Sequence, residues 1–373
     1  MLCYARDLAV PLKTLNIEPK SWIFGGENSL FERDRRRATV RTPRPFPAEH
    51  NRTQLSTATT FTMPLLTDAP VYAELEAEAA ALSSQHLRSL MGDGARCASM
   101  TAAHNGVTLD FSRQKATPTT AALLTTLLEQ QGVPSAMGRM MSGKECNPTE
   151  GRSVLHTALR CPKGSAPIEN KDGADVVPQV HGVLQRIAEF SAKVRSGDHL
   201  GATGEKLSSV IVIGIGGSYL GPEFVVDALR WDSEASAGAA GRTLRFLANV
   251  DPVDFAKATA GLDPKTTLVC VISKTFTTAE TMVNARSARE WLVGSLGEEA
   301  VAKHMVACST NLEGTSAFGI SPENVFGFWD WVGGRYSVCS AVGVLPIALH
   351  YGYAAAEAFL AGTDKDPCRA FLK

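Results

Sequence analysis

The chain has 373 residues and a mass of 39.8 kDa, a length sufficient for two compact domains. Hydrophobic residues make up 44% and charged residues 20%, which excludes wholesale disorder and collagen-like repeats. The net charge of −1 excludes an overall charge directed at nucleic acid or an anionic membrane, so neither is an expected partner.

Residues 1–62 are expected to form a basic, disordered extension, because they hold ten basic and six acidic side chains. Two other interpretations stay open. The Arg-, Ser-, Thr- and Pro-rich stretch 33–62 has the composition of a transit peptide, or the extension reflects an over-long gene model. No secretory signal is evident, since Arg6, Asp7 and Lys13 interrupt the N-terminal apolar residues. We therefore expect a cytoplasmic protein.

Residues 63–180 are predicted to be mainly helical. One helix begins near Asp68 and Pro70, where apolar residues recur every three or four positions. A second helix is predicted near 118–131, ended by Gly132 and Pro134. The polar segment 161–178 is the best candidate for a domain boundary, because it is interrupted by several prolines and glycines.

After Gly201 the pattern changes to short apolar runs that alternate with helical segments. Strands are predicted at 210–213, 244–247, 268–272, 306–308 and 325–328. Helices are predicted through Phe224–Leu229, from Pro252 and near 278–293. Continuous apolar strands are typical of a parallel sheet that is covered on both faces, so the predicted class is an α/β sandwich.

The longest apolar stretch is 338–361, and it contains Pro346, His350 and Glu357. These interruptions favour a buried helix of a core over a membrane span. The eight cysteines contain no CxxC pair, so we expect reduced thiols. No His/Cys cluster has zinc spacing, and no metal or cofactor is expected.

A glycine-rich turn, Gly214–Gly221, follows the first predicted strand of the sheet. Glycines allow backbone N–H groups to approach an anion at a helix N-terminus, and Ser218 adds a hydroxyl. Tight strand-to-helix packing is an equally good explanation. A dinucleotide-dependent oxidoreductase is disfavoured, because Tyr219 stands where the third fingerprint glycine would fall.

A second polar turn, Ser273–Thr278, follows the predicted strand 268–272. Four hydroxyls and one ammonium at the start of a helix favour phosphate binding. The alternative is helix capping, since Thr277 and Glu280 have the spacing of a capping box.

A third window, 328–337, reads FWDWVGGRYS and carries Arg335. Its paired glycines allow the guanidinium to approach a crowded site, where it would face an oxyanion or a phosphate. Alternatively, Arg335 pairs with Asp330 and the two tryptophans belong to the core.

These windows together resemble the glucose-6-phosphate isomerase family. The matching stretches are VIGIGGSYLGP (212–222), FLANVDPVDF (246–255), SKTFTTAET (273–281), FWDWVGGRYSVCSAVG (328–343) and NPTEGRSVLHTALR (147–160). The agreement runs in order from about Met63 to Leu360, and the spelling of 249–269 is similar to the plant and apicomplexan branch.

The resemblance implies a sugar-isomerase (SIS) αβα sandwich with a mainly parallel five-stranded sheet, beside an incomplete larger domain. It implies interconversion of glucose 6-phosphate and fructose 6-phosphate through an enediolate, without a cofactor, and a homodimer for the full-length family. The phosphate would be bound within Gly217, Ser218, Ser273, Lys274, Thr275, Phe276, Thr277 and Thr278, and Arg335 would stabilise the enediolate. The domains would be the helical region 63–180, a first SIS domain 181–345 and the start of the large domain 346–373.

One departure from the family qualifies this expectation. The base glutamate, the ring-opening histidine and the C-terminal lysine lie well downstream of GGRYS in the family, and none of their motifs occurs in the 38 residues after Arg335. Glu357 and His350 are not assigned those roles. We therefore expect a C-terminally truncated and impaired isomerase. The alternative is a non-catalytic module that binds phosphosugars.

Overall fold

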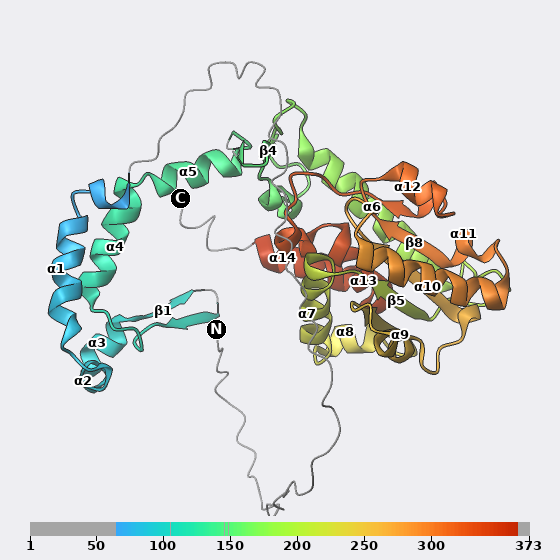
Figure 1. Cartoon of the computed structure of the whole chain (residues 1–373), viewed down its shortest axis with the longest axis horizontal. Helices are drawn as coiled ribbons and strands as arrows, with labels where there is room; N and C mark the ends of the chain where they lie inside the picture. Colours follow the sequence, from blue (N-terminus) through green and yellow to red (C-terminus); the bar gives the residue numbers. More distant parts are fainter. Residues whose placement is uncertain (1–64, 105, 145, 148, 365–373) are drawn as a thin grey trace, which may run out of the picture. The chain divides into compact units, whose positions relative to one another are not determined.

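The computed structural model describes residues 65–104, 106–144, 146–147 and 149–364. The predicted extension 1–62 lies outside the described residues. The described residues form two compact units, which divide between Leu123 and Leu124. Figure 1 colours the chain in sequence order, and we describe each unit by itself. The expected boundary between residues 180 and 181 stays a prediction.

The N-terminal unit combines short helices with a hairpin. Its elements are η1 (Leu66–Asp68), α1 (Tyr72–Ser83), α2 (Leu87–Gly92), α3 (Gly94–Ser99), β1 (Thr101–His104), β2 (Val107–Asp110) and the first part of α4 (Pro118–Gln130). The two helices predicted from sequence are confirmed as α1 and α4, but the antiparallel hairpin β1–β2 was not predicted. Pro134 does not end α4, because it lies in the first turn of another helix, α5 (Val133–Met141).

The second unit is an αβα sandwich. After α5 it contains β3 (Cys146–Asn147), β4 (Arg152–Ser153), η2 (His156–Arg160), α6 (Val176–Ser196), β5 (Ser209–Ile213), η3 (Gly216–Ser218), α7 (Leu220–Leu229), α8 (Ser233–Gly238), β6 (Thr243–Leu247), α9 (Pro252–Thr259), η4 (Pro264–Thr266), β7 (Thr267–Ile272), α10 (Ala279–Leu296), α11 (Ala300–His304), β8 (Met305–Cys308), α12 (Leu312–Ala317), η5 (Pro322–Asn324), β9 (Val325–Phe326), η6 (Gly334–Cys339), α13 (Ala341–Tyr351) and α14 (Tyr353–Asp364).

Five parallel strands form the sheet, in the order β6-β5-β7-β8-β9. All five predicted strands are confirmed, although the last is shorter than expected and ends at Phe326. Strand β7 is buried along its whole length, as expected for a strand covered on both faces. The predicted fold class is therefore confirmed.

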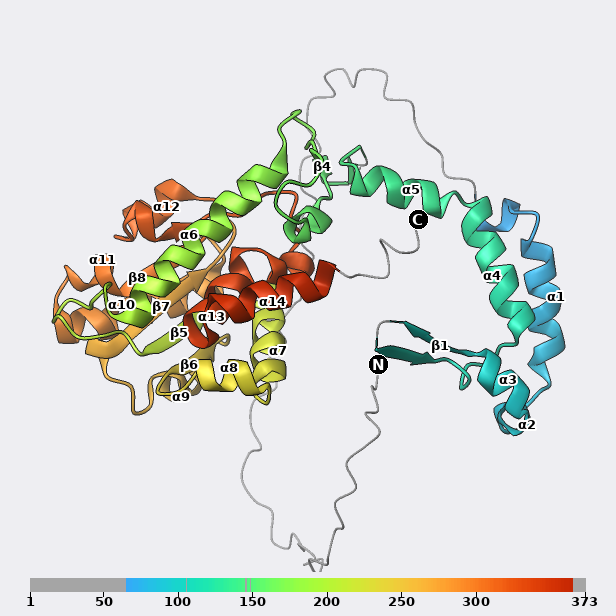
Figure 2. The same cartoon turned by 180° about the vertical axis from the view of Figure 1, so that it is seen from behind.

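Helices cover both faces of the sheet (Figures 1 and 2). Alternate residues along a strand belong to different hydrophobic cores. Val210 and Val212 of β5 pack with residues of α6, α7, α8, α13 and α14. Ile211 and Ile213 pack in the second core, with residues of α9, α10 and α11. The period of two along β5 thus divides its side chains between two hydrophobic cores.

The apolar stretch 338–361 forms two helices rather than one. Residue Gly352, with φ of 101°, separates α13 from α14. Every residue of α13 except His350 is buried, which confirms the prediction of a core helix. No helix among the described residues has the length and apolar content needed to cross a membrane.

The last turn of α13 is held by arginines. Arg195 donates to the carbonyl oxygens of Leu349 and His350 at 3.2 and 2.7 Å, and Arg242 donates to that of Leu349 at 2.9 Å. Burial, followed by the charges of Arg242, Arg195 and Arg230, lowers the pKa of His350 to about 4. The imidazole is therefore neutral in the folded protein at pH 7.

A pH dependence of stability follows from His350. Its pKa is lower in the folded chain, about 4, than the ordinary histidine value of 6.5, so its full contribution to stability is present above pH 6.5 and is lost as the pH falls toward 4. Thermal unfolding is expected at lower temperature at about pH 4.5 than at about pH 7. His350→Gln should reduce this decrease. His304, whose pKa burial also lowers, should account for part of what remains. An equal decrease in both proteins would contradict the role of His350.

Candidate phosphate site at the carboxyl edge of the sheet

The two polar turns predicted from sequence follow neighbouring strands of the sheet. Strands β5 and β7 are neighbours, with Ile213 paired to Val271. The chain continues from β5 to β6 on one side and from β7 to β8 on the other. Such a reversal of strand order opens a crevice at the carboxyl ends of the strands, where ligands bind in open α/β sheets.

The turn after β5 packs closely on the GGRYS segment. A Cβ atom on Gly217 would lie 2.1 Å from the carbonyl oxygen of Gly334. The hydroxyl of Ser337 donates to the carbonyl oxygens of Gly217 and Gly334, at 3.1 and 2.8 Å. Close packing therefore explains why residue 217 is a glycine, although the packing is against η6 rather than against the helix that follows β5. Ser218, half-buried, ends η3 beside this contact.

The turn after β7 presents its hydroxyls in two pairs. Ser273 is buried and donates to Thr278 Oγ1 at 3.4 Å, while Thr277 donates to Thr275 Oγ1 at 2.7 Å. Thr275, Thr277 and Thr278 are exposed, so their hydroxyls are accessible at the start of α10. Capping does not explain them, because Thr278 is the N-cap residue of α10 and its side chain accepts no cap hydrogen bond. The capping-box interpretation of Thr277 and Glu280 is wrong.

Phe276 gives this turn its shape. Its φ of 55° is the one positive value among the non-glycine residues that the structure describes. The left-handed conformation costs an ordinary residue about 1–2 kcal/mol. The side chain is 5% exposed and packs edge-on against Phe318, with ring centroids 5.6 Å apart. Burial of this ring offsets the backbone strain and holds the flanking threonines in place.

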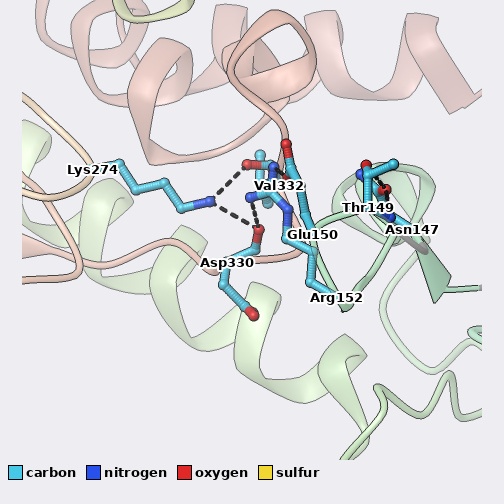
Figure 3. A network of polar contacts seen from close by, with 7 residues as sticks. All are labelled: Asn147, Thr149, Glu150, Arg152, Lys274, Asp330 and Val332. Carbon is cyan, nitrogen blue, oxygen red and sulfur yellow. Dashed lines mark hydrogen bonds and ion pairs between the residues drawn. The ribbon is translucent and has the colours of Figure 1, made fainter. Parts of the chain in front are cut away.

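Lys274 does not direct its ammonium toward the hydroxyls. Its Nζ donates to the carbonyl oxygens of Asp330 and Val332 at 2.8 and 3.2 Å (Figure 3). Burial and then the charge of Arg152 lower the pKa of Lys274, whereas Asp330 and Glu150 act in the opposite direction. A contribution of Lys274 to ligand binding through its backbone agrees with this geometry.

Arg152 was not predicted to belong to the site. Its Nη1 donates to the carbonyl oxygen of Asp330 at 2.6 Å, and its Nη2 forms an ion pair with Glu150. Figure 3 shows Arg152 and Lys274 reaching the 330–332 backbone from different segments. The neighbouring charges of Glu150 and Arg152 were the available signal, but the Asp330 carbonyl that Arg152 contacts lies 178 positions away in sequence.

Arg335 lies in the first turn of η6 and is exposed. Within the described residues, its guanidinium makes no hydrogen bond or ion pair, so the expected alternative of pairing with Asp330 is wrong. Trp329 and Trp331 stack with centroids 4.8 Å apart, and Trp331 is buried, which agrees with their placement in the core. Gly334, the residue before Arg335, packs against Gly217.

The sheet order, the two helical layers and the turns at the carboxyl edge define a sugar-isomerase type of αβα sandwich. Residues 110–367 match the sequence model of phosphoglucose isomerase. The chain belongs to the phosphoglucose isomerase family.

Curated relatives support this assignment. The chain is 55% identical over 298 residues to the cytosolic glucose-6-phosphate isomerase B of Oryza sativa subsp. japonica, covering 80% of this chain and 52% of that protein. It is 55% identical over 300 residues to the cytosolic glucose-6-phosphate isomerase of Arabidopsis thaliana, covering 80% and 53%. The chain spans about half the length of the curated relatives it matches.

A solved structure agrees with the fold. The glucose-6-phosphate isomerase from Chlamydia trachomatis D/UW-3/Cx superposes with a TM-score of 0.65 at 26% sequence identity. The match covers 81% of this chain and 56% of that chain.

Proposed function

We propose that this chain supplies the phosphate-binding part of a glucose-6-phosphate isomerase. The observation that carries the proposal is that the two polar turns follow the neighbouring parallel strands β5 and β7, the second of them at the N-terminus of the 18-residue helix α10. Backbone N–H groups and the helix dipole favour a phosphate dianion at such a place. The ligand groups would come from Gly217, Ser218, Ser273, Lys274, Thr275, Phe276, Thr277 and Thr278.

The proposed reaction interconverts glucose 6-phosphate and fructose 6-phosphate through an enediolate, without a cofactor. A carboxylate base moves a proton between C2 and C1, and the exposed guanidinium of Arg335 stabilises the negative oxygen that develops. The phosphate, which does not react, supplies binding energy that orients the reacting carbons.

The base is proposed to lie outside the residues of this sequence that match the family. Positioned general-base catalysis contributes about 10²–10⁴-fold to rate. We therefore propose that polypeptide 1–373, assayed by itself, turns over at least about a hundredfold more slowly than a full-length relative. Turnover equal to that of the relative in a coupled assay would contradict this.

A non-catalytic phosphosugar-binding module is the second candidate. The turns that would bind phosphate are separate from the base that would move the proton, so binding of a phosphosugar does not require turnover. Measurable affinity for fructose 6-phosphate without isomerisation would favour this candidate. Following the names of the relatives, we place either function in the cytosol, and we propose a homodimer for the complete protein.

Thr278 provides a direct test of phosphate binding. Thr278 makes no cap hydrogen bond and accepts only a long one, 3.4 Å, from Ser273, so Thr278→Val, which keeps the shape of the side chain, should leave the fold intact. Loss of one hydrogen bond to a charged phosphate should raise the Kd for fructose 6-phosphate about tenfold in calorimetric titration. Thr203→Val, at an exposed loop before β5, is the matched control and should bind as the unmodified chain does. Equal Kd values for both variants would argue against the site.

A further inference from the structure

The contact between Lys274 and the 330–332 backbone joins two parts of the proposed site. Lys274 belongs to the turn that carries the hydroxyls, whereas Asp330 and Val332 precede the segment that carries Arg335. We call the Lys274 ammonium and its two carbonyl acceptors the carbonyl clamp (Figure 3). An ammonium has three donors, and two of them are used here.

The Lys274 end of the clamp is rigid. Its own carbonyl oxygen accepts hydrogen bonds from the backbone N–H of Thr310 at 3.0 Å, from the Thr310 hydroxyl at 2.7 Å and from the Ser309 hydroxyl at 3.2 Å. The backbone of Lys274 is thus fixed to the loop after β8. Consequently, its side chain fixes the carbonyls of Asp330 and Val332 relative to the turn after β7.

The other end of the clamp lies just before Arg335. Val332 precedes Arg335 by three residues, and Gly334 between them rests against Gly217. Ser337, two residues after Arg335, donates to the carbonyl oxygen of Gly217 at 3.1 Å. Arg335 is therefore held between an anchor on the turn after β7 and an anchor on the turn after β5, although its guanidinium makes no hydrogen bond or ion pair in the described part of the chain.

We propose that Lys274 is a positioning residue, whose side chain sets the place of Arg335 relative to the phosphate turn by clamping the carbonyls of Asp330 and Val332. The proposal rests on the proposed function. Arg152 acts in the same direction, since it donates to the Asp330 carbonyl from a third segment. Reacting groups must be held within a fraction of an ångström, and a displacement of about 1 Å costs up to about a hundredfold.

Two ligands separate positioning from phosphate binding. Glycerol 3-phosphate offers a phosphate alone, whereas arabinonate 5-phosphate also offers a carboxylate that resembles the enediolate. Calorimetric titration of the full 373-residue chain gives the ratio of the two Kd values. We expect Lys274→Met to reduce the preference for the carboxylate ligand about tenfold, with little change in the Kd for glycerol 3-phosphate. Arg335→Met should abolish the same preference. In a double variant, Lys274→Met should cause little further loss beyond that of Arg335→Met.

Controls and rescue complete the test. Lys274→Arg retains the charge and the donors, so it should restore much of the preference. Lys257→Met, on the exposed side of α9, is the matched lysine control and should behave as the unmodified chain does. If Lys274→Met does not fold, Arg152→Met tests the same carbonyl from another segment, with the same expected loss of preference.

The outcomes are distinct. A retained preference in folded Lys274→Met would overturn the positioning role while leaving the proposed function standing. An equal weakening of both ligands would overturn it in favour of direct phosphate binding by the ammonium. Failure of the unmodified chain to bind either ligand would overturn the proposed function and, with it, this inference.

Discussion

Replacing Gly217 with alanine is expected to destabilise the second unit by about 3 kcal/mol and to abolish phosphate binding. The added Cβ would lie 2.1 Å from the carbonyl oxygen of Gly334 and 2.3 Å from its carbonyl carbon. These are backbone atoms, so no side-chain rotation relieves the clash. The turn after β5 must separate from η6, which displaces Ser218 and Arg335 together.

Gly294→Ala is the matched control for this prediction. Gly294 is exposed within α10, and no atom lies within 4 Å of the Cβ that alanine would add. Alanine there should be neutral or stabilise the helix by up to about 1 kcal/mol. Denaturant unfolding measures both variants, and calorimetry with fructose 6-phosphate measures binding. A Gly217→Ala protein as stable as the control would show that the two turns do not depend on this contact.

The sheet was predictable because its strands are buried on both faces. A strand such as β7, whose six residues are all apolar or small, leaves a continuous signal in sequence. The signal fails where elements are short. β9 has two residues, so the apolar residue Phe328 beyond it was wrongly included in the predicted strand. Likewise, one apolar run concealed the break at Gly352, because both flanking helices contribute to one core.

The candidate site was predictable in its residues but not in its connections. Apolar strands followed by polar turns placed Ser218 and Ser273 at the same edge of the sheet. The direction of the Lys274 side chain was not predictable, because its acceptors are backbone carbonyls, which leave no trace in side-chain identity. For the same reason, the sequence contains no sign that Gly217 requires Gly334 as its neighbour.

Arg96 should be the most sensitive position of the N-terminal unit. It is 6% exposed and lies on α3, and its guanidinium donates to the carbonyl oxygens of Leu90, Ser112, Gln114 and Ala116 at 2.6 to 3.2 Å. These bonds connect α2 to the loop between β2 and α4. Arg96→Met fills much of the same volume but leaves the carbonyls without their donor, which should cost at least about 3 kcal/mol.

Hydrogen exchange followed by mass spectrometry distinguishes this effect from general destabilisation. In Arg96→Met, amides of the loop 111–117 and of the hairpin β1–β2 should exchange faster, while β5 and β7 keep their protection. Arg88→Met, at an exposed position of α2, should leave both patterns unchanged. If the loop kept its protection in Arg96→Met, the apolar contacts of the unit, rather than the buried guanidinium, would determine its stability. That outcome would make the N-terminal unit an ordinary hydrophobic assembly, whereas the expected one makes it depend on a single buried cation bound by backbone carbonyls.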